Sequence, residues 1–285
     1  MVQPDLDRTR LTDGNVEELM KPAIFTSFDR TIPFAKVIPM IREAGFEVVS
    51  FGSRPQHSGY MAPAGRATIR KLLEENDITI DSLHAPFPEG DRLFSLNETE
   101  RLESIRQCQI AMDTAAELDG KIVVIHLIQP YGIPQGKVRN KMIEQGRRSV
   151  SILAAYADAR GVKLAMENGQ KDEYDQILIN FLSEFNDDHV GLCYDSGHEN
   201  VRGTCFTLLE QFGNRLLTVH IHDNNGTDTH VLPFEGAIDW ERFRKVFHGL
   251  RYSGNLLLEV DIKYSQFKDP AVFLSQARKR AERLI

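Results

Sequence analysis

Six successive short apolar segments of the chain each end at a residue that can bind a metal ion. In chain order these residues are His84, His126, Glu167, Asp195, His220 and Glu259. Only 41 acidic residues and nine histidines are spread over the 285 positions, so six ligand types in a row at one kind of position are not expected by chance. A mixed set of carboxylates and imidazoles suits Mn, Zn, Co, Fe or Mg better than a soft metal. The pattern indicates a metal-dependent enzyme.

A second group of candidate ligands follows the fourth and fifth of these positions. Residues 218–230 contain three histidines, at 220, 222 and 230, together with Asp223 and Asp228. Alternation along a strand places His220 and His222 on the same side. The run Asp195-Ser196-Gly197-His198 adds a further histidine three residues after a candidate ligand. Any one of these residues alone is better explained as a helix cap or a buried structural histidine, but four or more together favour a site.

The elements that must position these residues form a regular repeat. Short apolar segments alternate with longer segments of helical period through eight β/α pairs, which favours a closed (β/α)₈ barrel over an open sheet. In such a barrel the carboxyl ends of the strands meet at one mouth, where the chemistry takes place. The expected strands are Ala23–Phe28, Phe46–Phe51, Ile78–Leu83, Lys121–Ile125, Val162–Met166, His189–Tyr194, Arg215–Val219 and Asn255–Val260.

Helices are expected between and after these strands. The predicted fold class is α/β, a single (β/α)₈ TIM barrel over residues 22–285, preceded by an arm over residues 1–21. No Gly-x-Gly-x-x-Gly follows the first strand and no P-loop is found, so neither nucleotide-binding fold is favoured. The helical segments lie near Pro33–Ala44, Pro63–Asn76, Leu96–Leu118, Val138–Ala159, Asp175–Phe185 and Val201–Phe212, from Asp239 onward, and over Pro270–Leu284.

Composition narrows the class of protein further. The net charge of −7 gives no support to nonspecific nucleic-acid binding. Cys108, Cys193 and Cys205 form no Cys-x-x-Cys pair, which argues against a disulfide framework or a thiolate zinc site and fits a reducing cytosol. No apolar run approaches the length of a membrane span, and the first twenty residues lack the apolar core of a signal peptide. We therefore expect a cytoplasmic protein with no membrane partner.

Several motifs resemble those of one known family. Residues 83–87 (LHAPF), 166–168 (MEN), 194–198 (YDSGH), 220–223 (HIHD) and 234–240 (FEGAIDW) resemble the xylose isomerase-like (β/α)₈ barrels. That superfamily joins sugar isomerases and epimerases with the endonuclease IV-type AP endonucleases. The resemblance extends over about residues 23–285. Its most specific part, residues 220–240, is typical of the sugar phosphate isomerase/epimerase branch.

The resemblance to the epimerase branch implies one metal ion and two catalytic glutamates. Four positions that match the ligands of that branch are Glu167, Asp195, His220 and Glu259. Glu167 and Glu259 would exchange protons on opposite faces of the sugar, and His198 would contact the substrate. A divalent metal would polarise the carbonyl and stabilise an enediolate.

The resemblance to the endonuclease branch implies up to three zinc ions. His84 and His126 would form a second site with bridging Glu167, and His198, Asp228 and His230 a third. The loop between His220 and Asp228 is shorter than in the endonucleases, and no cluster of arginine and aromatic residues is found to open a duplex, which argues against DNA cleavage.

The sequence therefore predicts a divalent-metal-dependent isomerase or epimerase acting on a small carbohydrate or derived keto compound. A multi-zinc phosphodiesterase and a dehydratase or lyase on a related keto-polyol are the alternatives. One bound ion, of Mn, Zn, Co or Mg, is expected, with ligands for up to three, and a homo-oligomer is left open. Arg54, Arg202 and Lys263 are candidate contacts for a substrate phosphate or carboxylate, with solvated surface charge favoured for each.

Overall fold

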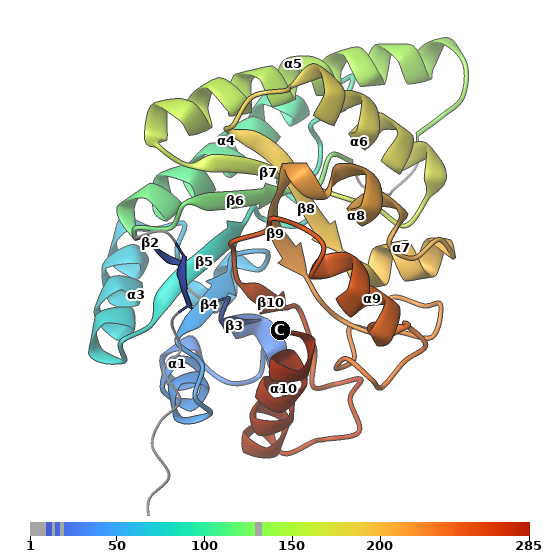
Figure 1. The fold of residues 1–285 in the computed structure, drawn as a ribbon. Helices are drawn as coiled ribbons and strands as arrows, with labels where there is room; N and C mark the ends of the chain where they lie inside the picture. Colours follow the sequence, from blue (N-terminus) through green and yellow to red (C-terminus); the bar gives the residue numbers. More distant parts are fainter. Residues whose placement is uncertain (1–9, 13–14, 18–19, 129–132) are drawn as a thin grey trace, which may run out of the picture.

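Eight parallel strands form a barrel in the computed structural model of the chain (Figure 1), which describes residues 10–12, 15–17, 20–128 and 133–285. Neighbouring strands follow the order β10-β3-β4-β5-β6-β7-β8-β9. The strands are β3 (Pro22–Phe25), β4 (Val48–Phe51), β5 (Thr79–His84), β6 (Ile122–Ile125), β7 (Lys163–Glu167), β8 (Val190–Asp195), β9 (Leu216–His220) and β10 (Leu256–Leu258).

The barrel closes between β9 and β10. Ile221, directly after β9, forms a parallel bridge with Leu258. The Ile221 amide donates to the carbonyl oxygen of Leu257 at 2.8 Å, and the Glu259 amide donates to the carbonyl oxygen of Ile221 at 3.1 Å. The predicted single (β/α)₈ barrel is therefore confirmed, and its closing seam lies beside His220 and Glu259.

Helices pack around the outside of the barrel (Figure 1). Asparagine and aspartate side chains begin several of them, because a side-chain oxygen can accept from a free amide of the first turn: Asn97 accepts from Thr99 at 3.0 Å, and Asp269 from Val272 at 2.9 Å. The helices are α1 (Phe34–Glu43), α2 (Pro55–Ser58), α3 (Pro63–Glu75), α4 (Glu98–Glu117), α5 (Lys137–Arg160), α6 (Asp172–Glu184), α7 (Ser196–Arg202), α8 (Thr207–Phe212), α9 (Trp240–Phe247) and α10 (Pro270–Leu284).

One predicted helix, Val201–Phe212, is wrong. The structure has α7 ending at Arg202 and a separate α8 beginning at Thr207. Gly203 and Phe206 lie between them with φ of +87° and +71°, and left-handed residues end a helix. α7 begins directly after β8, earlier than predicted, so that its first turn carries His198 into the mouth of the barrel.

The strands are buried along their whole length or nearly so, because the helices cover the outside and side chains fill the inside. Four of them extend one residue past the predicted end, so that His84, Glu167, Asp195 and His220 are the last residues of their strands. These side chains therefore share the regular geometry of the sheet rather than the freedom of a loop.

The first part of the chain contributes a small separate ladder. β1 (Arg10–Thr12) and β2 (Asn15–Glu17) pair antiparallel. Much of the predicted arm, residues 1–9, 13–14 and 18–19, lies outside the described residues, and the division at residue 21 stays a prediction. Within the part of the chain that is described, no helix combines the length and the apolar character needed to span a bilayer.

Candidate metal and active site

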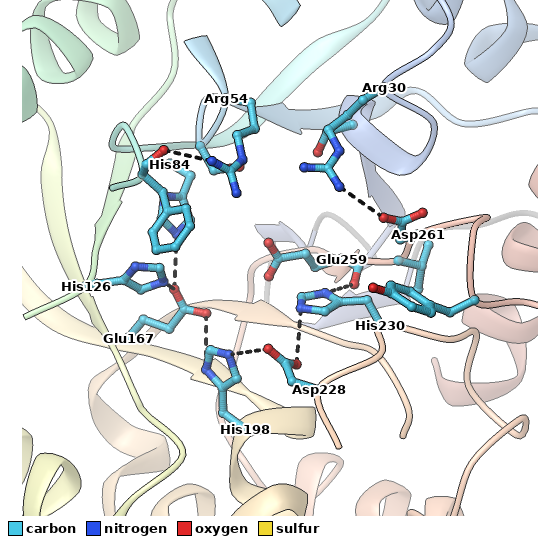
Figure 2. A pocket seen from close by; sticks show the side chains of 15 residues that line it. Arg30, Arg54, His84, His126, Glu167, His198, Asp228, His230, Glu259 and Asp261 are labelled. Carbon is cyan, nitrogen blue, oxygen red and sulfur yellow. Dashed lines mark hydrogen bonds and ion pairs between the residues drawn. The ribbon is translucent and has the colours of Figure 1, made fainter. Parts of the chain in front are cut away.

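The candidate ligands gather at the mouth where the strands end. Seven of the nine candidate ligands line a cavity of about 310 Å³, and Figure 2 shows these seven side chains pointing into it from different elements. Asp195 and His220 lie outside the lining of this cavity. The residues of the cavity wall are Ser27, Arg30, Ser53, Arg54, His84, Phe87, His126, Glu167, His198, Asp228, His230, Glu259, Val260, Asp261 and Tyr264.

Four of the predicted ligands form the centre of the site. Each of Glu167, Asp195, His220 and Glu259 offers one ligand atom, and these atoms lie within 4.8 Å of one another. His220 Nδ1 is 2.9 Å from Glu167 Oε1 and 2.9 Å from Glu259 Oε2. Glu167, Asp195 and His220 are fully buried, whereas the Glu259 side chain is 19% exposed and faces the cavity. Glu259 is thus the most accessible carboxylate of the four.

Glu167 remains ionised despite its burial. Burial alone raises the pKa of a carboxyl, but the charges of His220 and His126 and their hydrogen bonds hold the pKa of Glu167 well below its usual range. Its backbone is fixed too, because the Tyr174 hydroxyl donates to the Glu167 carbonyl oxygen at 3.0 Å. The same balance of burial against the charge of His220 lowers the pKa of Glu259 to about 2.

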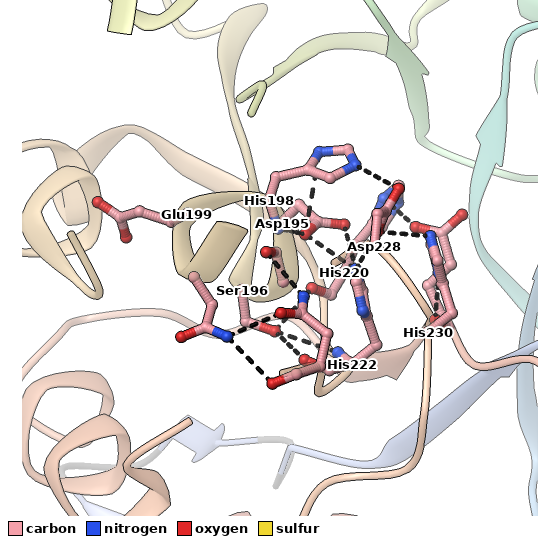
Figure 3. A network of polar contacts seen from close by, with 12 residues as sticks. Asp195, Ser196, His198, Glu199, His220, His222, Asp228 and His230 are labelled. Atoms are coloured by element: carbon pink, nitrogen blue, oxygen red, sulfur yellow. Dashed lines mark hydrogen bonds and ion pairs between the residues drawn. The ribbon is translucent and has the colours of Figure 1, made fainter. Parts of the chain in front are cut away.

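Asp195 is held by the first turn of α7 and by a histidine (Figure 3). The His198 amide donates to Asp195 Oδ1 at 2.6 Å, and His222 Nε2 lies 3.1 Å from the same oxygen. Gly197 makes this arrangement possible, because a Cβ at that position would lie 1.9 Å from the His222 ring. Asn168 completes the frame by accepting from the Asp195 amide at 2.6 Å.

The outer histidines are oriented by hydrogen bonds on the side away from the cavity. Nδ1 of His84, His198 and His230 donates to the carbonyl oxygens of Ala85, Asn168 and Glu259 at 2.7, 2.8 and 2.8 Å. A carbonyl oxygen can only accept, so these bonds fix the proton on Nδ1 and leave Nε2 facing the site.

The Nε2 atom of each of these three histidines, and that of His126, points toward a carboxylate. His84 Nε2 is 3.2 Å from Glu167 Oε2, and His126 Nε2 is 3.1 Å from the same oxygen. His230 Nε2 is 3.2 Å from Asp228 Oδ1, and His198 Nε2 is 3.7 Å from Asp228 Oδ2. Two further groups of candidate ligands result: His84, His126 and Glu167, and His198, Asp228 and His230.

A family model settles the relationship of this chain. The model described as xylose isomerase-like TIM barrel matches residues 38–278. The chain belongs to this family. The match includes all nine predicted metal ligands, whose individual roles the match does not assign.

Other members of the xylose isomerase-like family resemble the chain in sequence or in structure. An uncharacterized protein of Sinorhizobium fredii is 29% identical over 246 residues, 78% of this chain and 79% of that protein. The crystal structure of a D-tagatose 3-epimerase-like protein has a TM-score of 0.75 at 22% identity, over 93% of this chain and 98% of that one. A D-psicose 3-epimerase structure has a TM-score of 0.75 at 19% identity, over 92% and 97%. At these identities the structural likeness shows the shared fold.

Some site residues of this family member were not found by sequence patterns. Asp91 Oδ2 lies 3.0 Å from His126 Nδ1. Burial lowers the pKa of His126, but the charges of Asp91 and Glu167 outweigh that effect and raise the pKa to about 10. Arg30 lines the cavity. Both stand in loops with no periodic signal, whereas His222 was visible from its alternation with His220.

The three candidate anion contacts have different surroundings. Arg54 lines the cavity, and Lys263 is exposed as expected. For Arg202 the prediction of a solvated surface charge is wrong: its side chain is 10% exposed and pairs with Glu199 at 2.9 Å and Asp175 at 3.1 Å. Arg202 therefore has a structural partner and does not reach the cavity.

Proposed function

We propose that this protein is a divalent-metal-dependent isomerase or epimerase that acts on a small carbohydrate or a derived keto compound by proton transfer. One observation carries the proposal. Two carboxylates, Glu167 and Glu259, both lie 2.9 Å from one imidazole nitrogen, that of His220, at the wall of a cavity large enough for a sugar. Paired carboxylates at such a site are suited to removing and returning a proton.

The donor set fits a divalent cation. Glu167, Asp195, Asp228 and Glu259 bring four carboxylates to one small region, and a divalent cation bound among them would balance their negative charge when the histidines act as neutral ligands. Glu167, Asp195, His220 and Glu259 would hold the ion through three oxygens and one nitrogen, a set that hard and borderline metals prefer. When bound, such an ion polarises a substrate carbonyl and its neighbouring hydroxyl.

The side chains of the cavity have distinct roles in this proposal. Glu259, the more exposed of the pair, would take a proton from the carbon beside the carbonyl, and Glu167 would hold or return one on the other side. His198, with Nδ1 fixed by Asn168 and Nε2 facing the cavity, would position a substrate hydroxyl. The solved structures of similar fold support this proposal, since they are those of a D-tagatose 3-epimerase-like protein and a D-psicose 3-epimerase. The three unpaired cysteines support a cytosolic location.

Removal of the metal tests the proposal directly. Dialysis against EDTA is expected to abolish deuterium exchange from solvent into a ketose panel and to lower the unfolding temperature, since a ligand that binds only the folded state stabilises it. Addition of Mn²⁺ or Co²⁺ should restore both. Exchange is measured by NMR, and unfolding by differential scanning fluorimetry. A protein whose activity and unfolding temperature are indifferent to the chelator would contradict the proposal.

A multi-metal phosphodiesterase is the second candidate function. The observation that favours it is the fixed Nδ1 proton on His84, His198 and His230, which leaves three Nε2 atoms aimed at carboxylates in two groups beyond the central four. Two or more metal ions clamp a phosphate in such enzymes.

Metal stoichiometry separates the two candidates. One equivalent per chain, unchanged in a His84→Asn variant, is expected for the isomerase. Three equivalents, with one lost in His84→Asn, together with cleavage of abasic DNA or a phosphodiester dye, would replace the isomerase by the phosphodiesterase. Metal content is measured by inductively coupled plasma mass spectrometry, with His248→Asn, on the C-cap of α9 away from the cavity, as the matched control.

A further inference from the structure

Two arginines stand on the wall of the cavity, and neither has a role in the proton transfer proposed above. Arg30 follows the short 3₁₀ helix η1 (Thr26–Phe28), which comes directly after β3, and Arg54 follows β4. Figure 2 shows both guanidinium groups pointing into the cavity from one edge, with Glu167 and Glu259 across from them. Ser27 and Ser53, from the same two loops, also line the wall.

Arg54 is held in place without the neutralising partner that a surface arginine usually has. Its Nη1 donates to the Phe87 carbonyl oxygen at 3.2 Å, and its guanidinium lies 4.7 Å from the centre of the Phe87 ring. Among the described residues, none offers Arg54 a carboxylate within ion-pair distance. The contacts with Phe87 orient the guanidinium group of Arg54 and leave its other N–H donors available for another acceptor.

Arg30 is only loosely engaged. Its Nη2 is 3.4 Å from Asp261 Oδ2, and its side chain is 49% exposed. Burial and then the charge of Arg30 lower the pKa of Arg54, against the smaller opposing effect of the charges of Glu89 and Asp91. Two cations held on one edge of a cavity repel, and an anion between them relieves that repulsion.

We propose that Arg30 and Arg54 bind a terminal anionic group of the substrate, a phosphate or a carboxylate. The inference rests on the proposed function, because it assigns the substrate class of the same cavity. The acidic side, with its metal ligands, would receive the carbonyl end of the keto sugar, and the basic edge would receive the charged end. A planar guanidinium matches either anion with paired hydrogen bonds, and the hydroxyls of Ser27 and Ser53 can add neutral donors.

The other basic candidates do not compete for this role. Arg202 is paired with Glu199 and Asp175 outside the cavity wall. Lys263 is exposed and its Nζ lies 3.4 Å from the Tyr264 hydroxyl. The separation of charge across the cavity therefore depends on Arg30 and Arg54.

The first test is substrate selectivity. Matched sets of a neutral ketose, its terminal phosphate and the keto acid with a terminal carboxylate are compared by kcat/KM for deuterium exchange. Wild-type protein is expected to prefer one anionic member, and Arg54→Met should reduce that preference by about 10- to 100-fold, mainly through KM, as for a lost charge-assisted hydrogen bond. Arg54→Lys should recover part of it, and Arg148→Met, on the outer face of α5, should retain it. The preferred member tells phosphate from carboxylate.

The second test does not depend on turnover. Isothermal titration calorimetry with inorganic phosphate and with acetate is expected to show binding that weakens by at least 10-fold in Arg54→Met and Arg30→Met but not in Arg148→Met. If this holds while no ketose exchanges deuterium, the anion site stands and the isomerase reaction is wrong. If neutral and anionic ketoses are used equally and Arg54→Met alters neither selectivity nor anion binding in a protein with unchanged unfolding temperature, the proposal is overturned.

Discussion

Replacement of Glu167 or Glu259 with glutamine is expected to reduce proton exchange between a ketose and solvent by at least about 10³-fold. General acid–base catalysis by one positioned group contributes roughly 10²–10⁴-fold, and both carboxylates are also proposed metal ligands. Glutamine keeps the size of the side chain but can neither hold a proton for transfer nor supply a negative charge. The measurement is solvent deuterium incorporation followed by NMR.

The control for this prediction separates loss of chemistry from loss of fold. Glu144 lies on the exposed face of α5. The Glu144→Gln variant should therefore exchange protons at the wild-type rate. Metal content measured on each variant tells a missing proton carrier from a missing ion. If both Glu167→Gln and Glu259→Gln retain most of the exchange rate, the two-carboxylate mechanism is wrong.

Replacement of Asp223 with alanine is expected to destabilise the protein by about 3–5 kcal/mol, the cost of removing one partner from a buried charged network. The fully buried carboxylate accepts four hydrogen bonds. They come from the amides of Asn224 at 2.8 Å, Phe234 at 3.0 Å and Ile238 at 3.1 Å, and from Trp240 Nε1 at 2.8 Å. Alanine leaves all four donors without this acceptor, and three of them, from Asn224, Ile238 and Trp240, are buried.

Thermal unfolding measures this effect, with an expected fall in the midpoint of about 5–10 °C for a chain of this size. Asp239→Ala is the matched control from the same segment. Asp239 is exposed and accepts a single hydrogen bond, from the Arg242 amide at 2.9 Å at the start of α9, so its loss should cost only about 1 kcal/mol. If the two substitutions lower the unfolding midpoint equally, the buried hydrogen bonds of Asp223 stabilise the fold no more than the exposed one of Asp239, and the prediction is wrong.

Sequence alone predicted the barrel and the gathering of the candidate ligands because both follow from local patterns. A buried parallel strand is a short apolar run, and the residue after it must stand at the mouth. That rule was enough to place His84, Glu167, Asp195, His220 and Glu259 at one end of the barrel. At four of these positions the strand extends one residue beyond its predicted end, because a polar last residue does not fit the pattern of an apolar run.

The features that sequence patterns missed depend on contacts between distant segments. Two of the four donors to Asp223 are backbone amides 11 and 15 residues away, which no side-chain pattern reveals. The break between α7 and α8 involves two left-handed residues, Gly203 and Phe206; glycine commonly ends a helix, but a phenylalanine in this conformation cannot be predicted from its residue type. Arg30 and Asp91 stand in irregular loops, where position is set by the fold rather than by periodicity.

During synthesis, the candidate site can be completed only after the seam between β9 and β10 has formed. Ile221, which bridges to Leu258, separates His220 from His222, and its carbonyl oxygen holds the amide of Glu259. The last of the four proposed ligands thus directly follows β10, which is synthesised after the other seven strands of the barrel. A growing chain that has completed β3 to β9 has no Glu259 to complete the proposed set of four ligands. Full metal affinity should therefore report that the barrel has closed, and a chain truncated before β10 should fail to acquire it.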